Sequence, residues 1–251
     1  MWSTLRSCLD RLADTQGEAI DAAAAACAGS IAGGGIAWVF GAGHSAIMGL
    51  EAYPRIGGVL GFVPIVELSL LYFSNVVGSG GLDQVIYLER VPGYADVLAR
   101  SYDLRAGDSL IIFSGSGLEV LPLEMASAGR ARGLTVVAVT ALDYSRQAAS
   151  RRGVSPILGD SADVVIDSGI PLGDAAIEVP GLAARVGPTS TVINAAAMNC
   201  ICVATAGKLV ELGHSPQVFG SPHLTGDGYD AYAAALSSYR ALIARHPRGA
   251  E

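Results

Sequence analysis

Short apolar runs alternate along the chain with longer segments of helical character. Polar residues do not alternate within these runs, which is typical of strands that are buried on both faces. The runs that we interpret as strands are Ile36–Phe40, Val59–Val66, Val85–Leu88, Leu110–Phe113, Thr135–Thr140, Val164–Asp167 and a last candidate, Ala175–Val179. Because strands and helices alternate, the pattern predicts an α/β fold, with a parallel sheet in a three-layer α/β/α sandwich and right-handed crossovers.

The segments between the runs predict helices. The first covers residues 1–34 and stops at the consecutive glycines that begin with Gly33. The others are His44–Ile56, Leu68–Val77, Tyr94–Tyr102, a helix after Gly117 that ends near Gly133, Tyr144–Arg152, Ser190–Leu212 and Asp230–Arg245. No internal repeat or linker interrupts this order. We therefore expect one domain over residues 1–251, with helical additions at 1–34 and 213–251.

The composition is typical of a folded chain and bears on which classes of ligand it can bind. Of the 251 residues, 51% are hydrophobic and 16% are charged, so the chain can bury a sizeable core. The net charge of −7 argues against a nucleic-acid partner, because a phosphate backbone calls for clustered lysines and arginines. A small phosphorylated ligand remains compatible, since backbone N–H groups and hydroxyls bind phosphate with little formal positive charge.

We expect a cytoplasmic protein that neither enters a membrane nor holds a metal or cofactor. The N-terminus lacks a basic region followed by an apolar run. The apolar segment Ser190–Gly207 carries Asn194 and Asn199, and we interpret it as a buried helix. The cysteines fit no zinc spacing, and we interpret them as buried, reduced thiols. They are Cys8, Cys27, Cys200 and Cys202.

The first candidate site is a glycine turn that follows the first strand. Gly41 and Gly43 allow the backbone to approach an anion closely, and Ser45 adds a hydroxyl where the next helix begins. A dinucleotide-binding turn would have a third glycine and an acidic residue at the end of the second strand, and this chain matches neither feature. The turn therefore favours a phosphate site, with an ordinary tight turn as the alternative.

A second loop of small residues follows the strand Leu110–Phe113. Ser114, Ser116 and Gly117 lead into a helix, and hydroxyls in such a loop can bind several phosphate oxygens. The alternative for each serine is helix capping. Thr140, at the end of the next strand, can line the same edge. Since ligands of open α/β sheets bind at the carboxyl ends of the strands, the two loops predict one shared anion site.

Together the two loops resemble the sugar isomerase (SIS) domain family, in the order Gly-x-Gly-x-Ser and then Ser-x-Ser-Gly. The resemblance covers nearly the whole chain and is closest to a subgroup of single-domain SIS proteins. Its further motifs are Gly-His-Ser with Glu51, Gly57-Gly58, Pro122-x-Glu124, Asp163–Asp167, Pro171-x-Gly173-Asp174-Ala175 and Gly187–Thr191. The resemblance implies a five-stranded parallel sheet, phosphosugar binding and a homodimer or homotetramer.

By this resemblance, the phosphate of the ligand is bound by Ser45, Ser114 and Ser116. One position departs from the family pattern. Glu119 stands where the family often has threonine or asparagine, and a carboxylate beside a phosphate would repel it. Either Glu119 turns away from the loop or the anion of the ligand sits differently.

The family includes aldose–ketose isomerases, which move a proton between neighbouring carbons through an enediol and so need a base and a group that polarises the carbonyl. Glu51 is the candidate base, with an ion pair to Arg55 as the alternative role. His44 is a candidate acid or phosphate ligand, or else a loop histidine bonded to backbone. His223, in a tail rich in glycine and proline, is a candidate that can reach a site in its own or a neighbouring subunit.

Two hypotheses for function follow. The first is an isomerase that acts on a sugar phosphate, and the second is a non-catalytic phosphosugar sensor or binding module. Sugar-phosphate deaminases and a lyase share the same fold and stay open as well. A DNA-binding regulator is disfavoured, because the N-terminal helix Trp2–Ala28 carries only Arg6 and Arg11 as basic residues.

Overall fold

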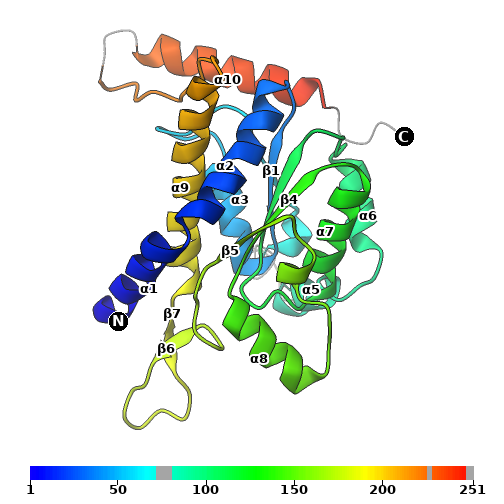
Figure 1. Ribbon diagram of the computed structural model, residues 1–251, viewed down its shortest axis with the longest axis vertical. Coiled ribbons are helices and arrows are strands. Elements are labelled where there is room, and N and C mark those ends of the chain that lie inside the picture. Colours follow the sequence, from blue (N-terminus) through cyan, green and yellow to red (C-terminus); the bar gives the residue numbers. More distant parts are fainter. Residues whose placement is uncertain (72–80, 225–227, 247–251) are drawn as a thin grey trace.

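The computed structural model describes residues 1–71, 81–224 and 228–246. Its centre is a five-stranded sheet in the order β2-β1-β3-β4-β5, in which every pairing is parallel (Figure 1). The strands are β1 (Ala37–Gly41), β2 (Phe62–Ile65), β3 (Ser109–Phe113), β4 (Thr135–Thr140) and β5 (Val164–Asp167). The predicted α/β fold with a five-stranded parallel sheet is therefore confirmed.

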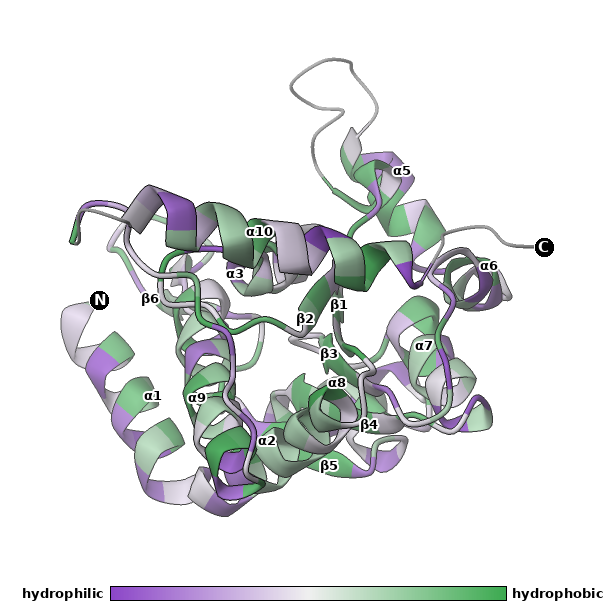
Figure 2. Ribbon diagram, turned by 90° about the horizontal axis from the view of Figure 1, so that it is seen from above, coloured by the Kyte–Doolittle hydropathy of each residue, from purple (hydrophilic) through white to green (hydrophobic). Residues whose placement is uncertain are grey.

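Helices cover both faces of the sheet. Successive residues of a strand point to opposite sides, so these apolar strands present side chains for burial on both faces. On one face, Trp38 and Phe40 of β1 pack with α6 (Tyr94–Ser101), α7 (Val120–Ala131) and α10 (Gly228–Ala244). On the other face, Val39 packs with α2 (Gly17–Ala32) and α9 (Ser190–Glu211). Figure 2 shows the strands as hydrophobic ribbons between these two groups of helices. Burial on both faces explains why the strand sequences show no polar alternation.

The N-terminal segment is two helices and not the single helix predicted over residues 1–34. α1 (Trp2–Thr15) ends at Thr15, and α2 begins at Gly17, so Gln16 alone separates the two helices. The side chain of Gln16 accepts a hydrogen bond from the backbone N–H of Asp167 on β5, at 2.9 Å. The break thus coincides with a contact to a distant strand, which local helical pattern does not reveal.

Two predicted elements change their type or their length. The run Val85–Leu88 belongs to a helix, α5 (Gly81–Leu88), and is not a strand. Within it, Val85 is buried whereas Tyr87 is 69% exposed, and periodicity alone cannot separate such a short run from a strand. The helix predicted at His44–Ile56 is a 3₁₀ turn, η1 (Gly43–Ala46), followed by α3 (Ile47–Ala52). Tyr53 then adopts an extended conformation, as expected for a residue before proline.

Of the helix predicted at Leu68–Val77, the structure has a short 3₁₀ helix, η2 (Leu68–Leu70), and residues 72–77 lie outside the described residues. The last predicted strand exists as β6 (Ala175–Ile177), but it does not join the main sheet. It pairs antiparallel with β7 (Val186–Pro188), a strand that sequence reasoning missed because it is so short. The remaining elements are α8 (Leu142–Arg152) and η3 (Leu158–Asp160).

One face of the helix α9 is buried, mainly against α2. By length and composition it is the one helix in the described part of the chain that could span a membrane, yet 39% of its most apolar window is buried inside the protein. The opposite face exposes Val203, which is 73% accessible. All four cysteines are free, but the prediction of four buried thiols holds in full only at Cys27, because Cys8 and Cys202 are half-buried and Cys200 on α9 is exposed.

Candidate functional site

The two glycine- and serine-rich loops leave the sheet side by side. β1 and β3 are neighbours in the sheet, and Gly41 at the end of β1 faces Phe113 at the end of β3. The loop Gly41–Ser45 and the loop Ser114–Gly117 begin at this pair of residues. They therefore share the carboxyl edge of the sheet, the edge at which ligands of open parallel sheets bind.

Close backbone packing shapes the first loop. A Cβ on Gly41 would lie 2.5 Å from the backbone carbonyl carbon and oxygen of Ser45, so no larger residue fits there. Gly43 has a positive φ of 57°, which glycine adopts without strain. His44 is exposed on the short turn η1. Among the described residues, the hydroxyl of Ser45 has no hydrogen-bond partner, so it is available to a ligand.

The second loop is folded around Gly117. The backbone N–H of Gly117 donates to the hydroxyl of Ser114 at 3.2 Å, and its φ is +62°. A Cβ on Gly117 would lie 2.8 Å from the hydroxyl of Thr140 and 3.2 Å from that of Ser145. Those two side chains are fully buried and lie 3.3 Å apart. Thr140 is thus placed beneath the loop, where it supports Gly117.

The donors that remain open in the second loop are neutral. No described residue accepts from the backbone N–H groups of Gly115 and Ser116 or bonds to the Ser116 hydroxyl. The helix α7, which follows, has few donors left in its first turn. The N–H of Leu121 donates to the carbonyl of Glu89 at 2.9 Å, and Pro122 has no N–H. An anion here would be held by the loop more than by the helix terminus.

Glu119, the residue that departs from the family pattern, is engaged by two arginines. Its carboxylate oxygens lie 3.2 Å from Nε of Arg90 and 3.1 Å from Nη1 of Arg152. Glu119 does not cap α7, although it stands at the N-cap position. The carboxylate is thus paired with two cations, which offsets the repulsion that it would exert on a phosphate.

Two further titratable groups lie beside Glu119. Burial, followed by the charge of Glu119, raises the pKa of Glu89 to about 7, and Arg90 opposes the shift. Burial, followed by the charges of Asp174 and Glu119, also raises the pKa of Tyr144, and Arg152 opposes that shift. Sequence reasoning missed Glu89, because nothing in its local pattern shows that the segment after α5 packs on α7.

Glu51, the candidate base, lies at the end of α3 and faces α9. Its Oε1 accepts a hydrogen bond from Asn199 at 2.9 Å and pairs with Arg55 at i+4. These residues line a small cavity of about 120 Å³ together with Cys202, Gly57 and Gly58, so the cavity at Glu51 is bordered by the segment before β2 and not by the two loops. Burial raises the pKa of the Cys202 thiol to about 12, so this thiol is not a nucleophile. His44 and Glu51 lie on successive helices, η1 and α3.

The segment that carries His223 runs along the opposite, amino edge of the sheet. Val218 forms a bridge with Val59, and Phe219 exchanges backbone hydrogen bonds with Gly57 and Gly58, just before β2 begins. His223 itself is exposed and stacks edge-on against Tyr229, with ring centroids 5.9 Å apart. The structure therefore does not bring His223 to the two loops of its own chain.

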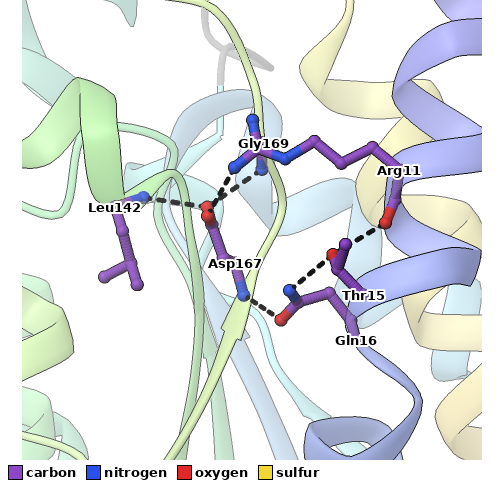
Figure 3. Close-up of polar contacts among 6 residues, drawn as sticks. All are labelled: Arg11, Thr15, Gln16, Leu142, Asp167 and Gly169. Carbon is purple, nitrogen blue, oxygen red and sulfur yellow. Dashed lines mark hydrogen bonds and ion pairs between the residues drawn. The ribbon is translucent and has the colours of Figure 1, made fainter.

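Two carboxylates at the carboxyl edge have structural partners. Figure 3 shows Asp167, at the end of β5, accepting from the backbone N–H groups of Leu142 and Gly169, each at 3.0 Å, and from Arg11 of α1 at 2.8 Å. Asp174 accepts from the backbone N–H groups of Thr189 and Ser190, each at 2.8 Å, and thereby caps α9. In the described ranges, no group of three or more His, Cys, Asp or Glu side chains could hold a metal ion.

Comparisons with known proteins agree with this architecture. Two solved phosphoheptose isomerases share the fold: one from Neisseria gonorrhoeae (TM-score 0.52, 19% identity, 82% of this chain and 93% of that chain) and one from Francisella tularensis (TM-score 0.53, 14% identity, 81% and 93%). At such low identity this likeness concerns the fold alone.

Curated relatives resemble the chain over nearly its full length. The UPF0309 protein of Streptomyces griseus is 36% identical over 240 residues, which cover 94% of this chain and 92% of that protein. A UPF0309 protein of Brucella canis is 34% identical over 231 residues, covering 92% and 89%. Residues 2–141 match the SIS domain, as the order of the two loops had indicated. The protein therefore belongs to the SIS domain family, and its relatives are UPF0309 proteins.

Proposed function

We propose that this protein binds a phosphorylated sugar at the carboxyl edge of its sheet and interconverts the aldose and ketose forms through an enediol. The observation that carries the proposal is the register of β1 and β3, which sets the loops Gly41–Ser45 and Ser114–Gly117 side by side. The hydroxyls of Ser45 and Ser116 and the amides of the second loop are then the phosphate donors.

Glu51 is the proposed base. It follows Ser45 on α3, and a carboxylate can take a proton from the carbon beside a carbonyl. Asn199 and Arg55 hold Oε1 of this carboxylate, so the side chain is oriented before a substrate arrives. His44, exposed at the mouth of the first loop, is the proposed proton donor to the substrate oxygen. His223 acts in this proposal only if a second subunit brings it to the edge.

A phosphosugar sensor is the second candidate function, and one observation favours it. The carboxylate of Glu51 is already paired with Arg55, which is the structural role that its sequence position also predicts. If this pairing is its whole role, the fold binds a sugar phosphate without turning it over.

Binding and turnover separate the two candidates. A panel of sugar phosphates at millimolar concentration should raise the Tm of the protein, since ligand at 100 times its Kd adds about 2.7 kcal/mol of stability. In deuterated water, the ligand that stabilises best should exchange the hydrogen on the carbon beside its carbonyl. Glu51→Gln should keep the Tm shift and lose exchange by about 10²-fold or more. Glu211→Gln, on the exposed last turn of α9, is the matched control and should keep both.

The outcomes are distinct. Stabilisation of the wild type without exchange would support the sensor, and release of ammonia from an amino sugar phosphate would support a deaminase. If no sugar phosphate raises the Tm, both candidates fail.

We also propose that the protein is a homodimer or homotetramer of the cytoplasm. The exposed face of α9 carries Val192, Val203 and Val210, which are spaced so that they fall on one side of the helix. Leu50, 52% exposed, lies on the neighbouring α3. An apolar surface of this kind fits a second copy of the chain. Four free thiols fit a reducing compartment.

A further inference from the structure

The second loop presents an electrostatic problem to a phosphate ligand. Its open donors are the amides of Gly115 and Ser116 and one hydroxyl, all of them neutral. A phosphate monoester carries close to two negative charges at neutral pH. The loop is followed by Glu119, and Glu89 lies near it. Neutral donors can bind phosphate, but two carboxyl groups beside them would weaken the binding, so positive charge nearby would strengthen it.

Arg90 and Arg152 supply that charge from two different elements. Arg90 follows α5 and Arg152 ends α8, and they reach Glu119 on either side of its carboxylate. Each guanidinium has five N–H groups, and the contact with Glu119 is the only hydrogen bond that either one makes to a described residue. The arginine side chains are 58% and 47% exposed, whereas that of Glu119 is 21% exposed. Glu119 is thus the inner member of the three, with arginine donors left over around it.

We propose that Arg90 and Arg152, held by Glu119, form the cationic part of the phosphate site at the Ser114–Gly117 loop. The inference rests on the proposed phosphosugar function and adds to the serines two residues that contact the anion directly. Glu119 is a positioning residue that fixes both guanidiniums beside the loop.

The chemistry of the three side chains suits this role. Guanidinium groups bind phosphate with two parallel N–H donors, which lysine cannot reproduce. Two arginines and one carboxylate leave a net positive charge, so the group attracts an anion even though Glu119 is part of it. Among the acidic residues nearby, Glu89 has a raised pKa of about 7, which makes it partly neutral at physiological pH, and the carboxylate of Asp174 is bonded to the start of α9. Asp83 lines a surface pocket together with Arg90.

The test measures the affinity of the folded protein for inorganic phosphate and for the best-stabilising sugar phosphate, by titration calorimetry. Arg90→Gln and Arg152→Gln should each weaken both affinities by about tenfold or more, because each removes a charge-assisted hydrogen bond to the anion. The Lys variants at these positions should retain part of the affinity. The control is Arg130→Gln. Arg130 lies in the last turn of α7, is similarly exposed (51%) and is paired with Asp163.

The Tm of each variant without ligand shows whether it is folded. Unchanged affinities in folded Arg90→Gln and Arg152→Gln would overturn the inference while leaving the proposed function in place. An equal loss in Arg130→Gln would also overturn it, because the effect would then be one of overall charge. A wild-type protein that binds no phosphate of either kind would overturn the proposed function and this inference together.

Discussion

At the scale of single residues, the carboxyl edge of the sheet combines neutral hydrogen-bond donors with carboxylates. Neighbouring residues offset the charges of these carboxylates. Ser45 and Ser116 keep their hydroxyls open, whereas Thr140 and Ser145 use theirs on each other beneath Gly117. Glu119 is balanced by arginines that are 29 and 33 residues away along the chain. The charge of Glu119 is thus balanced by ion pairs, whereas that of Glu89 is reduced by its raised pKa.

Glu89 makes stability depend on pH. Its pKa is about 7 in the folded chain against 4.5 for the free side chain, so the folded state favours the protonated form. The stability that this group contributes is full below its unfolded pKa and is lost as the pH rises through its folded pKa. Glu89→Gln should therefore exceed the wild type in Tm at about pH 8 and approach it at about pH 5. Thermal unfolding followed by circular dichroism across this range checks the prediction, and a parallel shift at every pH would contradict it.

At the scale of elements, several motifs that carried the family resemblance form hydrogen bonds that connect one element to another. Gly57 and Gly58 exchange hydrogen bonds with Phe219 and tie the tail to the segment before β2. The carboxylate of Asp174, after β5, binds the first residues of α9. These motifs position the long helix and the tail around the sheet.

Among these contacts, the loss of the Asp174 side chain has the clearest expected effect on the free energy of unfolding. It has a positive φ of 65°, which aspartate tolerates better than alanine does, and it supplies the cap of α9. Asp174→Ala should lower the free energy of unfolding by about 2 kcal/mol, through the lost cap and the strained backbone. Urea unfolding measures this change. Glu178→Ala, which removes an exposed carboxylate on the same hairpin, should change the free energy by less than about 0.5 kcal/mol.

At the scale of the whole molecule, different helices pack on the two faces of the sheet. α6, α7 and α10 close one face, and α2 and α9 close the other. On that second side the outward surface of α9 and α3 exposes Val192, Val203, Val210 and Leu50. A surface of this kind is costly in water, and association with another copy removes the cost.

Association through α9 predicts a sensitive position. Val203→Asp places a charge where the wild type has a 73% exposed valine, so it should shift a dimer or tetramer toward smaller species. Light scattering on a sizing column measures the mass. Val97→Asp, on α6 across the sheet and 45% exposed, is the control and should keep the wild-type mass. A wild type that is monomeric at micromolar concentration would contradict the proposed assembly.

The sequence by itself determined the five strands of the main sheet and the first glycine turn, because buried parallel strands need apolar runs and the tight turn needs glycine at Gly41 and Gly43. It did not determine what the short run Val85–Leu88 would become, because so few residues satisfy a strand and a helix equally well. Only the tertiary structure decided which strands are neighbours.

The same division holds for the candidate site. Local pattern marked Ser45, Ser114 and Ser116 as residues of the site, since small hydroxyl residues beside glycine form a recognisable turn. The partners of Glu119 and Asp167 could not be found in this way, because Arg90, Arg152 and Arg11 reach them from separate elements. Charge pairing across a fold depends on distances in space, and a sequence records only separations along the chain.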